Sequence, residues 1–134
     1  MHRFLGLVAV LGTLAFAGAA AATTDTQAQN PDLTVSVSLS PDAVAVGETV
    51  TATETVTNSS TTKQVVTVTS TLTYPDGHTA SQTQKVVLKA GETFSQTASY
   101  TRDALDAAGT YTLTLSATSK SGTSTAQATV VYSA

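Results

Sequence analysis

The sequence contains no cysteine and no tryptophan, and its charged residues are sparse. Without cysteine the chain has no disulfide, no thiolate metal site, no cysteine nucleophile and no N-terminal cysteine to carry a lipid anchor. Six basic and nine acidic residues give a net charge of −3, whereas proteins that bind nucleic acid usually present clustered lysine and arginine. We therefore expect no nucleic-acid partner and no thiol-based chemistry.

The start of the chain carries an apolar run. A basic start at 1–3 precedes an almost wholly apolar segment at 4–17, and the small residues at 20–22 suit a signal peptidase. The run is short for a membrane span, which takes about 20 residues, and no basic stop-transfer cluster follows it. We predict a signal peptide over 1–22, a disordered linker over 23–31, and a secreted protein, periplasmic or extracellular, without membrane contact after cleavage.

From Leu33 to Tyr132 apolar and polar residues alternate, which places one set on each face of a β-strand. Seven such runs occur, separated by turn residues such as Pro75-Asp76-Gly77. Only 102–108 has helical character, and we expect a single turn there, ended by Gly109. No segment is long enough for the helix of a parallel crossover. We predict an all-β fold over 32–134, a seven-stranded antiparallel sandwich of two sheets without a disulfide.

The motif DAAGTYTL at 106–113 resembles the corner before strand F of immunoglobulin-like domains, where a tyrosine hydroxyl bonds the preceding loop. The segments VGETV at 46–50, VTN at 56–58 and LKAGET at 88–93 resemble turns of bacterial surface immunoglobulin-like and CARDB-like domains, which are fibronectin III-like. The resemblance covers residues 32–133.

The resemblance implies an immunoglobulin-like sandwich and structural roles for a small group of residues. Leu113 stands where an antibody-type domain has a disulfide cysteine, so that bridge is absent. Because this fold hosts many unrelated functions, the resemblance implies little about activity. The residues with implied structural roles are Asp106, Gly109, Tyr111 and Leu113.

Residues suited to catalysis are few. Beyond the predicted signal peptide His78 is the only histidine, and it follows the turn at 75–77. A solvated turn offers no buried acid to hold a histidine as general base, and no glycine-rich phosphate loop occurs. We predict that the protein is not an enzyme and carries no cofactor.

Successive up-and-down strands place their loops alternately at the two ends of a sandwich, so we expect one acidic and one basic end. Converging carboxylates are able to hold Ca²⁺, which takes about six to eight oxygen ligands, and the alternative is that they are solvated loop charges. The candidate Ca²⁺ ligands are Asp42, Asp76, Asp103 and Asp106. The candidate binding-loop residues of the opposite end are Lys63, Lys89 and Lys120. The chain should enter and leave the domain at opposite ends.

Glu54 breaks the alternation of its strand, since its parity places it in the core between Ala52 and Val56. An unpaired charge is costly there. Three interpretations stay open: burial raises its pKa and gives it a function, a bulge turns it outward, or it meets a tyrosine hydroxyl.

Two functions from different classes fit these features. One is an exported, non-catalytic module that binds an unidentified protein or surface polymer through a loop end or through an exposed edge strand, the first, fourth or last. The other is a small secreted inhibitor or accessory protein acting on an extracytoplasmic enzyme. The loops at 59–63 and 119–122 lack an apolar anchor for a pocket, which favours the first. We expect a monomer.

Overall fold

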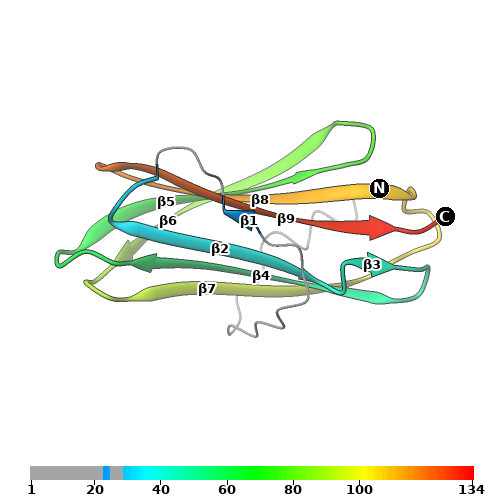
Figure 1. Ribbon diagram of the computed structural model, residues 1–134, viewed down its shortest axis with the longest axis horizontal. Coiled ribbons are helices and arrows are strands. Elements are labelled where there is room, and N and C mark those ends of the chain that lie inside the picture. The colour runs from blue at the N-terminus through cyan, green and yellow to red at the C-terminus, as the bar shows by residue number, and fades with distance from the viewer. Residues whose placement is uncertain (1–22, 25–28) are drawn as a thin grey trace.

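The computed structural model describes residues 23–24 and 29–134, so the predicted signal peptide and part of the predicted linker lie outside the described residues. All regular secondary structure of the described part is β, as predicted (Figure 1). It consists of seven long strands and two strands of two residues each. The strands are β1 (Thr23–Thr24), β2 (Leu33–Ser40), β3 (Ala43–Val44), β4 (Thr49–Asn58), β5 (Gln64–Thr73), β6 (Thr79–Leu88), β7 (Thr93–Thr101), β8 (Gly109–Ser119) and β9 (Gly122–Tyr132).

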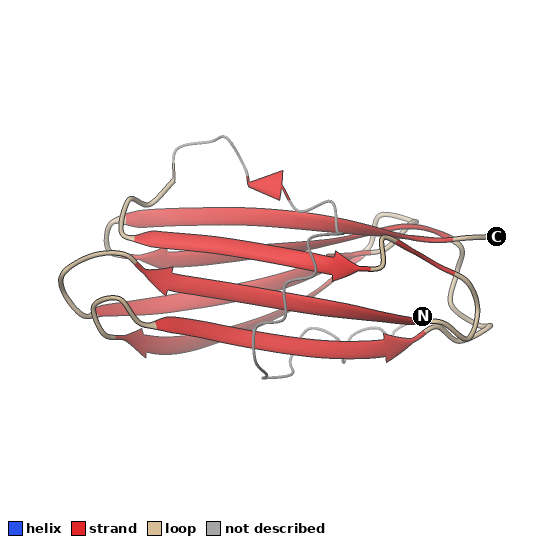
Figure 2. Cartoon of the chain, turned by 60° about the horizontal axis from the view of Figure 1, so that its bottom comes forward, coloured by secondary structure: helices blue, strands red, loops and turns tan. Residues whose placement is uncertain are grey.

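The strands form two layers that pack face to face (Figure 2). The smaller sheet has the order β2-β4-β7, and the larger has the order β1-β9-β8-β5-β6 with β3 added to β9. The pairing of β3 with β9 is parallel, which corrects the prediction of a wholly antiparallel fold. The chain passes from the small sheet to the larger one between β2 and β3 without reversing its direction. Strand β3 therefore runs parallel to β9.

The residues of apolar parity form the core between the sheets. Valines and leucines of every long strand except β7 lie there almost without solvent contact, β6 supplying only Leu88, and each contributes roughly 1.5–3 kcal/mol by burial. Strand β6 is exposed along most of its length, which confirms the prediction of a partly exposed edge there. The largest fully buried side chains are Val37, Leu39, Val44, Val50, Val56, Leu72, Tyr111, Leu113, Leu115 and Tyr132.

Glu54 lies inside this core with 4% of its surface exposed. The register of β4 runs without interruption past it, so no bulge turns it outward, and its partners are not tyrosines. Its Oε1 accepts hydrogen bonds from Ser70 Oγ at 3.0 Å and Gln96 Nε2 at 2.8 Å. Burial raises the pKa of Glu54 to about 7, against the lowering effect of the two hydrogen bonds. The bulge and tyrosine interpretations are therefore wrong, and Glu54 is buried with a raised pKa, while a function for it stays a hypothesis.

Residues 102–108 form a turn and contain no helix, contrary to the sequence prediction. Asp103 Oδ1 accepts a hydrogen bond from the Leu105 N–H at 2.9 Å, and Asp106 Oδ2 accepts one from the Asp103 N–H at 2.9 Å. Aspartate side chains that bond nearby amides compete with helical backbone bonding, which explains the turn.

The chain enters and leaves the sandwich at opposite ends, as predicted. Asn30 Nδ2 donates to Ser119 Oγ at 2.7 Å and to the Gly122 carbonyl at 2.9 Å, beside the β8–β9 turn. At the other end the Ser133 N–H donates to the Val44 carbonyl at 3.1 Å. The contacts of Asn30 also show that the ordered domain begins before residue 32.

Candidate functional site

Three loops meet where the chain leaves the sandwich, and we call this end the exit end. They are residues 41–48, 74–78 and 102–108, which the topology predicted to lie together. Backbone hydrogen bonds join the first to the third, from the Gly47 N–H to the Arg102 carbonyl at 2.9 Å and from the Arg102 N–H to the Glu48 carbonyl at 2.8 Å. These loops therefore form one surface.

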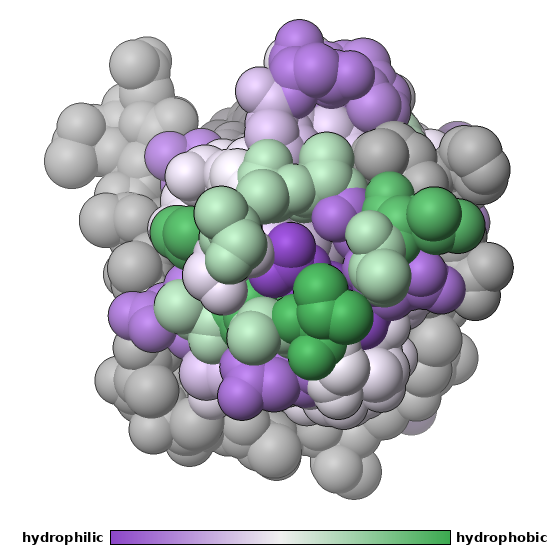
Figure 3. Space-filling view, turned by 90° about the vertical axis from the view of Figure 1, so that its right-hand side faces the viewer, coloured by the Kyte–Doolittle hydropathy of each residue, from purple (hydrophilic) through white to green (hydrophobic). Residues whose placement is uncertain are grey.

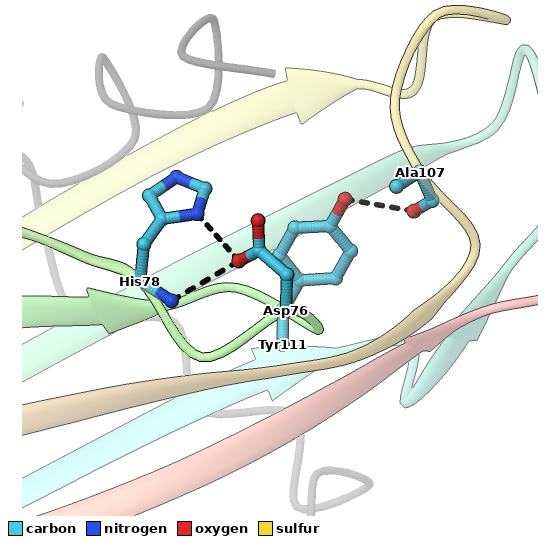
Figure 4. Close-up of polar contacts among 4 residues, drawn as sticks. All are labelled: Asp76, His78, Ala107 and Tyr111. Atoms are coloured by element: carbon cyan, nitrogen blue, oxygen red, sulfur yellow. Dashed lines mark hydrogen bonds and ion pairs between the residues drawn. The ribbon is translucent and has the colours of Figure 1, made fainter.

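Tyr111 holds the 102–108 turn in place. Its hydroxyl donates a 2.7 Å hydrogen bond to the Ala107 carbonyl, which confirms the corner implied by the immunoglobulin-like motif (Figure 4). Burial, and secondarily the charge of Asp106, raises the pKa of Tyr111 to about 12, so the hydroxyl keeps its proton and remains a donor. Asp106 is itself buried and accepts a 2.6 Å hydrogen bond from the Tyr100 hydroxyl.

Gly109 and Leu113 also occupy structural positions. Gly109 adopts a φ of +131°, and a Cβ at this position would lie 2.7 Å from Cβ of Pro75. The missing side chain thus lets the 74–78 turn pack against the start of β8. Leu113 is fully buried in the core, where hydrophobic packing takes the place of a disulfide.

Arg102 ties the last residues of the chain to this end. Its Nη1 donates to the Val44 carbonyl at 2.8 Å and to the Ser133 carbonyl at 2.7 Å, and its guanidinium lies 4.7 Å from the centre of the Tyr132 ring. Arg102 is buried although it lies in a loop. Arg102 lies just after the end of β7, so the alternation of side chains along a strand does not predict that it is buried or that it binds the end of the chain.

The four candidate Ca²⁺ ligands lie at the exit end, yet they do not converge on one point. Asp76 accepts hydrogen bonds from the backbone N–H and ring Nδ1 of His78 (Figure 4), and these bonds lower the pKa of Asp76. Asp103 and Asp106 bond the amides of their own turn. In residues 23–24 and 29–134 no group of three or more histidine or carboxylate side chains is placed to hold a metal. Asp42 and Asp76 are exposed loop charges, as the alternative has it, whereas Asp106 is buried and structural.

An apolar patch covers the exit end, and sequence reasoning missed it because it looked for anchors only at 59–63 and 119–122. Figure 3 looks onto this end and shows the apolar side chains gathered around a small polar centre. Leu105 is 76% exposed and Val46 is 55% exposed. The sequence does contain a signal for this patch, which is the leucine at 105 among the alanines of the 102–108 turn. We define the apolar patch as Ala45, Val46, Ala104, Leu105, Ala107 and Ala108, all of which are exposed.

The opposite end, which we call the entry end, carries the predicted lysines. Lys63 and Lys120 come together and, with Gln64 and Val65, line a pocket of about 170 Å³. Lys89 lies apart on the 89–92 turn, where its N–H donates to Glu92 Oε1 at 2.8 Å. The structure therefore unites two of the three candidate binding-loop residues.

The free sheet edges are β6 in the larger sheet and β2 and β7 in the smaller one, within the part of the chain that the structure describes. The last strand, β9, is flanked by β1 and β3 and is not a free edge there. The part of the chain that the structure describes contains no apolar helix of membrane-spanning length.

The structure is similar to domains of several solved proteins. A CARDB domain from Pyrococcus furiosus, solved in complex with di-metal ions, has 20% identity and a TM-score of 0.55, covering 76% of this chain and 88% of that one. Pseudomonas fluorescens alkylpurine DNA glycosylase, bound to DNA, has 16% identity and a TM-score of 0.56 over 77% of this chain. The Bacillus subtilis sporulation control protein has 16% identity and a TM-score of 0.52 over 78% of this chain.

These likenesses show the fold alone. This chain spans 31% of the glycosylase and 50% of the sporulation protein. No curated protein sequence matches it. The CARDB family model, however, matches residues 30–130, which is most of the chain and nearly all of the sandwich. The protein therefore belongs to the CARDB family, a family of non-catalytic, immunoglobulin-like β-sandwich domains.

Proposed function

We propose that this protein is an exported, non-catalytic interaction module that binds a protein partner through the apolar patch. The observation that carries the proposal is the 76% exposure of Leu105 within the apolar patch, where Val46 is also 55% exposed. A protruding apolar side chain gains free energy when a partner covers it, and a few such anchors dominate binding at interfaces.

The patch also lies on a rigid support. The Tyr111 hydroxyl fixes the turn that carries Leu105, and the backbone bonds of Arg102 fix the neighbouring turn that carries Val46. A binding surface that is already ordered loses little conformational entropy on association. The geometry therefore suits a preformed binding site.

Two features support a non-catalytic role. CARDB domains are non-catalytic modules, and the His78 ring is paired with Asp76 on the same exposed turn and stacked on Tyr74, with a centroid distance of 4.1 Å. That arrangement lacks the buried acid and adjacent nucleophile of a hydrolytic triad. The Pyrococcus furiosus domain was solved with di-metal ions, whereas among residues 23–24 and 29–134 of this chain no three histidine or carboxylate side chains are placed to hold a metal.

The alternative function, an inhibitor or accessory protein of an extracytoplasmic enzyme, draws on the same exposed leucine. A narrow rigid turn with an apolar tip is a shape that enters a cleft. Assays against a panel of proteases, with the wild type beside Leu105→Asp, separate the two functions. Inhibition that disappears in Leu105→Asp favours the alternative, and no inhibition favours the module.

A photo-cross-linking amino acid at position 105 tests the binding function in the producing cells. We expect a discrete cross-linked protein from position 105 and none from position 83, an exposed site in the middle of β6. Cross-links of equal yield from both positions, or none from either, would contradict binding of a protein through the patch. A cross-link to a surface polymer alone would reassign the partner class.

Export is tested separately. If the predicted signal peptide is removed after Ala22, N-terminal sequencing of protein from the periplasm or medium begins at Thr23. Protein that stays in the cytoplasm with Met1 intact contradicts the export proposal without affecting the binding test.

A further inference from the structure

The two ends of the sandwich differ in charge. Five carboxylates lie at the exit end against one arginine, which leaves a formal charge of −4 there. Three lysines lie at the entry end against two carboxylates, which leaves +1. The exit-end carboxylates are Asp42, Glu48, Asp76, Asp103 and Asp106, and the entry-end charges are Lys63, Lys89, Lys120, Asp32 and Glu92. Each end is thus electrostatically complementary to the other.

The ends also match in shape and polarity. At the exit end Leu105 projects from a turn, and at the entry end Val65, which is 58% exposed, lines the pocket of about 170 Å³. A cavity of roughly 150 Å³ is large enough for benzene, so this pocket has room for the side chain of a leucine. Lys63 and Lys120, both exposed, also line it, and a lysine at such a place is able to cover apolar surface with its alkyl stem while its ammonium group stays in water.

We propose that the partner of the apolar patch is a second copy of this chain, bound head to tail. Leu105 of one copy enters the Val65 pocket of the next, and the exit-end carboxylates face Lys63 and Lys120 around it. This inference rests on the proposed function and names its partner. It departs from the monomer expected from the sequence, because the apolar patch was not recognised there.

The geometry determines what kind of assembly results. The two contacting surfaces are different and lie at opposite ends of the sandwich, so the contact is heterologous and leaves a free surface at each end of a pair. Copies therefore add in a row instead of closing into a dimer. The end of a single sandwich is small beside the ~800 Å² per partner of a standard interface, so association is reversible and depends on concentration. Salt weakens it by screening the charges.

Sedimentation velocity of the purified protein over a concentration series tests the assembly. We expect the weight-average mass of the wild type to rise with concentration and to fall again at high salt. Leu105→Asp removes the anchor, and Val65→Asp blocks the pocket; each alone should sediment as a monomer. Thr83→Asp, on the exposed face of β6, is the matched control and should associate like the wild type.

Mixing the two variants gives the sharpest result. Leu105→Asp keeps an intact entry end and Val65→Asp keeps an intact exit end, so an equimolar mixture should form pairs and nothing longer. A wild type that is monomeric at every concentration, or a mixture that stays monomeric while the wild type assembles, overturns the head-to-tail inference. If the wild type is monomeric but position 105 still cross-links to a different protein, only this inference fails. If position 105 also yields no cross-link, the proposed function fails with it.

Discussion

Gln96 Nε2 donates a 2.8 Å hydrogen bond to Glu54 Oε1 on the neighbouring strand of the small sheet, and Gln84 Nε2 of the larger sheet donates a 2.9 Å hydrogen bond to Gln96 Oε1. The chain of contacts runs from a carboxyl in the core to a side chain on the exposed strand β6. The second carboxyl oxygen of Glu54, Oε2, is buried and has no hydrogen-bond partner within the part of the chain that the structure describes. The two hydrogen bonds to Oε1 favour the charged carboxylate, but burial with Oε2 unpartnered outweighs them and favours the protonated form.

The first prediction is that stability decreases as the pH rises. The pKa of Glu54 is about 7 in the folded protein against an ordinary value of 4.5, so folding favours the protonated form. This contribution is complete below the ordinary pKa and is lost as the pH passes through about 7. The difference is worth at most about 3 kcal/mol. Urea unfolding from about pH 5 to pH 9 should show the decline.

Glu54→Gln isolates this effect, because glutamine keeps an acceptor for Ser70 and Gln96 but does not ionise. We expect its free energy of unfolding to change less with pH than that of the wild type. Glu92→Gln, on the exposed 89–92 turn, is the matched control and should follow the wild type. If the free energy of unfolding changed equally with pH in the wild type and in Glu54→Gln, burial would not raise the pKa of Glu54.

The second prediction concerns the hydroxyl of Tyr111. Tyr111→Phe removes the 2.7 Å hydrogen bond to the Ala107 carbonyl and should lower the free energy of unfolding by about 1 kcal/mol. The buried ring remains, so the fold should be retained. Tyr74→Phe is the control, since the Tyr74 hydroxyl has no hydrogen bond to any described residue. Equal losses in the two variants would argue against a specific role for the corner.

The third prediction concerns the close approach of Gly109 and Pro75. Gly109→Ala would place a Cβ 2.7 Å from the Pro75 Cβ at a φ of +131°, and we expect a loss of at least about 2 kcal/mol. Gly77→Ala, at a φ of +95° with open space around it, reports the backbone strain alone. The steric part should shrink when Gly109→Ala is combined with Pro75→Gly. Thermal unfolding of the wild type, Gly109→Ala, Pro75→Gly and the double variant completes a double-mutant cycle. If the stability losses of the two single variants simply add in the double variant, the clash is ruled out.

The fourth prediction concerns Arg102. Arg102→Met leaves two carbonyls without their charged donor and should cost about 3 kcal/mol. Because Arg102 joins Val44 to Ser133, hydrogen exchange at the amides of 131–133 should speed up more than exchange in the middle of β9. Lys85→Met, at an exposed position on β6, should change neither measurement. Uniform acceleration along β9 would mean that Arg102 supports the whole domain and not this end in particular.

Much of the fold was predictable because its signal is local. Alternation identified which side chains face the core, and the motif at 106–113 identified the hydrogen bond of Tyr111, whose partner is four residues away. The turn at 102–108 was assigned helical character because its composition permits a helix. The bonds from Asp103 and Asp106 to nearby amides decided otherwise, and they depend on side-chain rotamers that composition does not encode.

The candidate site was less predictable. The topology brought the right loops to each end, yet neither the exposure of Leu105 nor the pairing of Lys63 with Lys120 followed from it. An apolar residue on a turn faces solvent or core according to how neighbouring loops pack. Residues 46 and 105 become neighbours only through the backbone bonds between the turns that carry them.

By itself the sequence determined that the chain folds into two sheets with a shared apolar interior, since the backbone sends successive side chains of a strand to opposite faces whatever the partner strand is. Only the tertiary structure decided which distant residues meet: Glu54 with Ser70 and Gln96, Arg102 with Tyr132, and the loops that expose Leu105. The reason is physical. Parity is a property of one strand, whereas burial, a shifted pKa and a binding surface depend on what the other strands and loops place beside it.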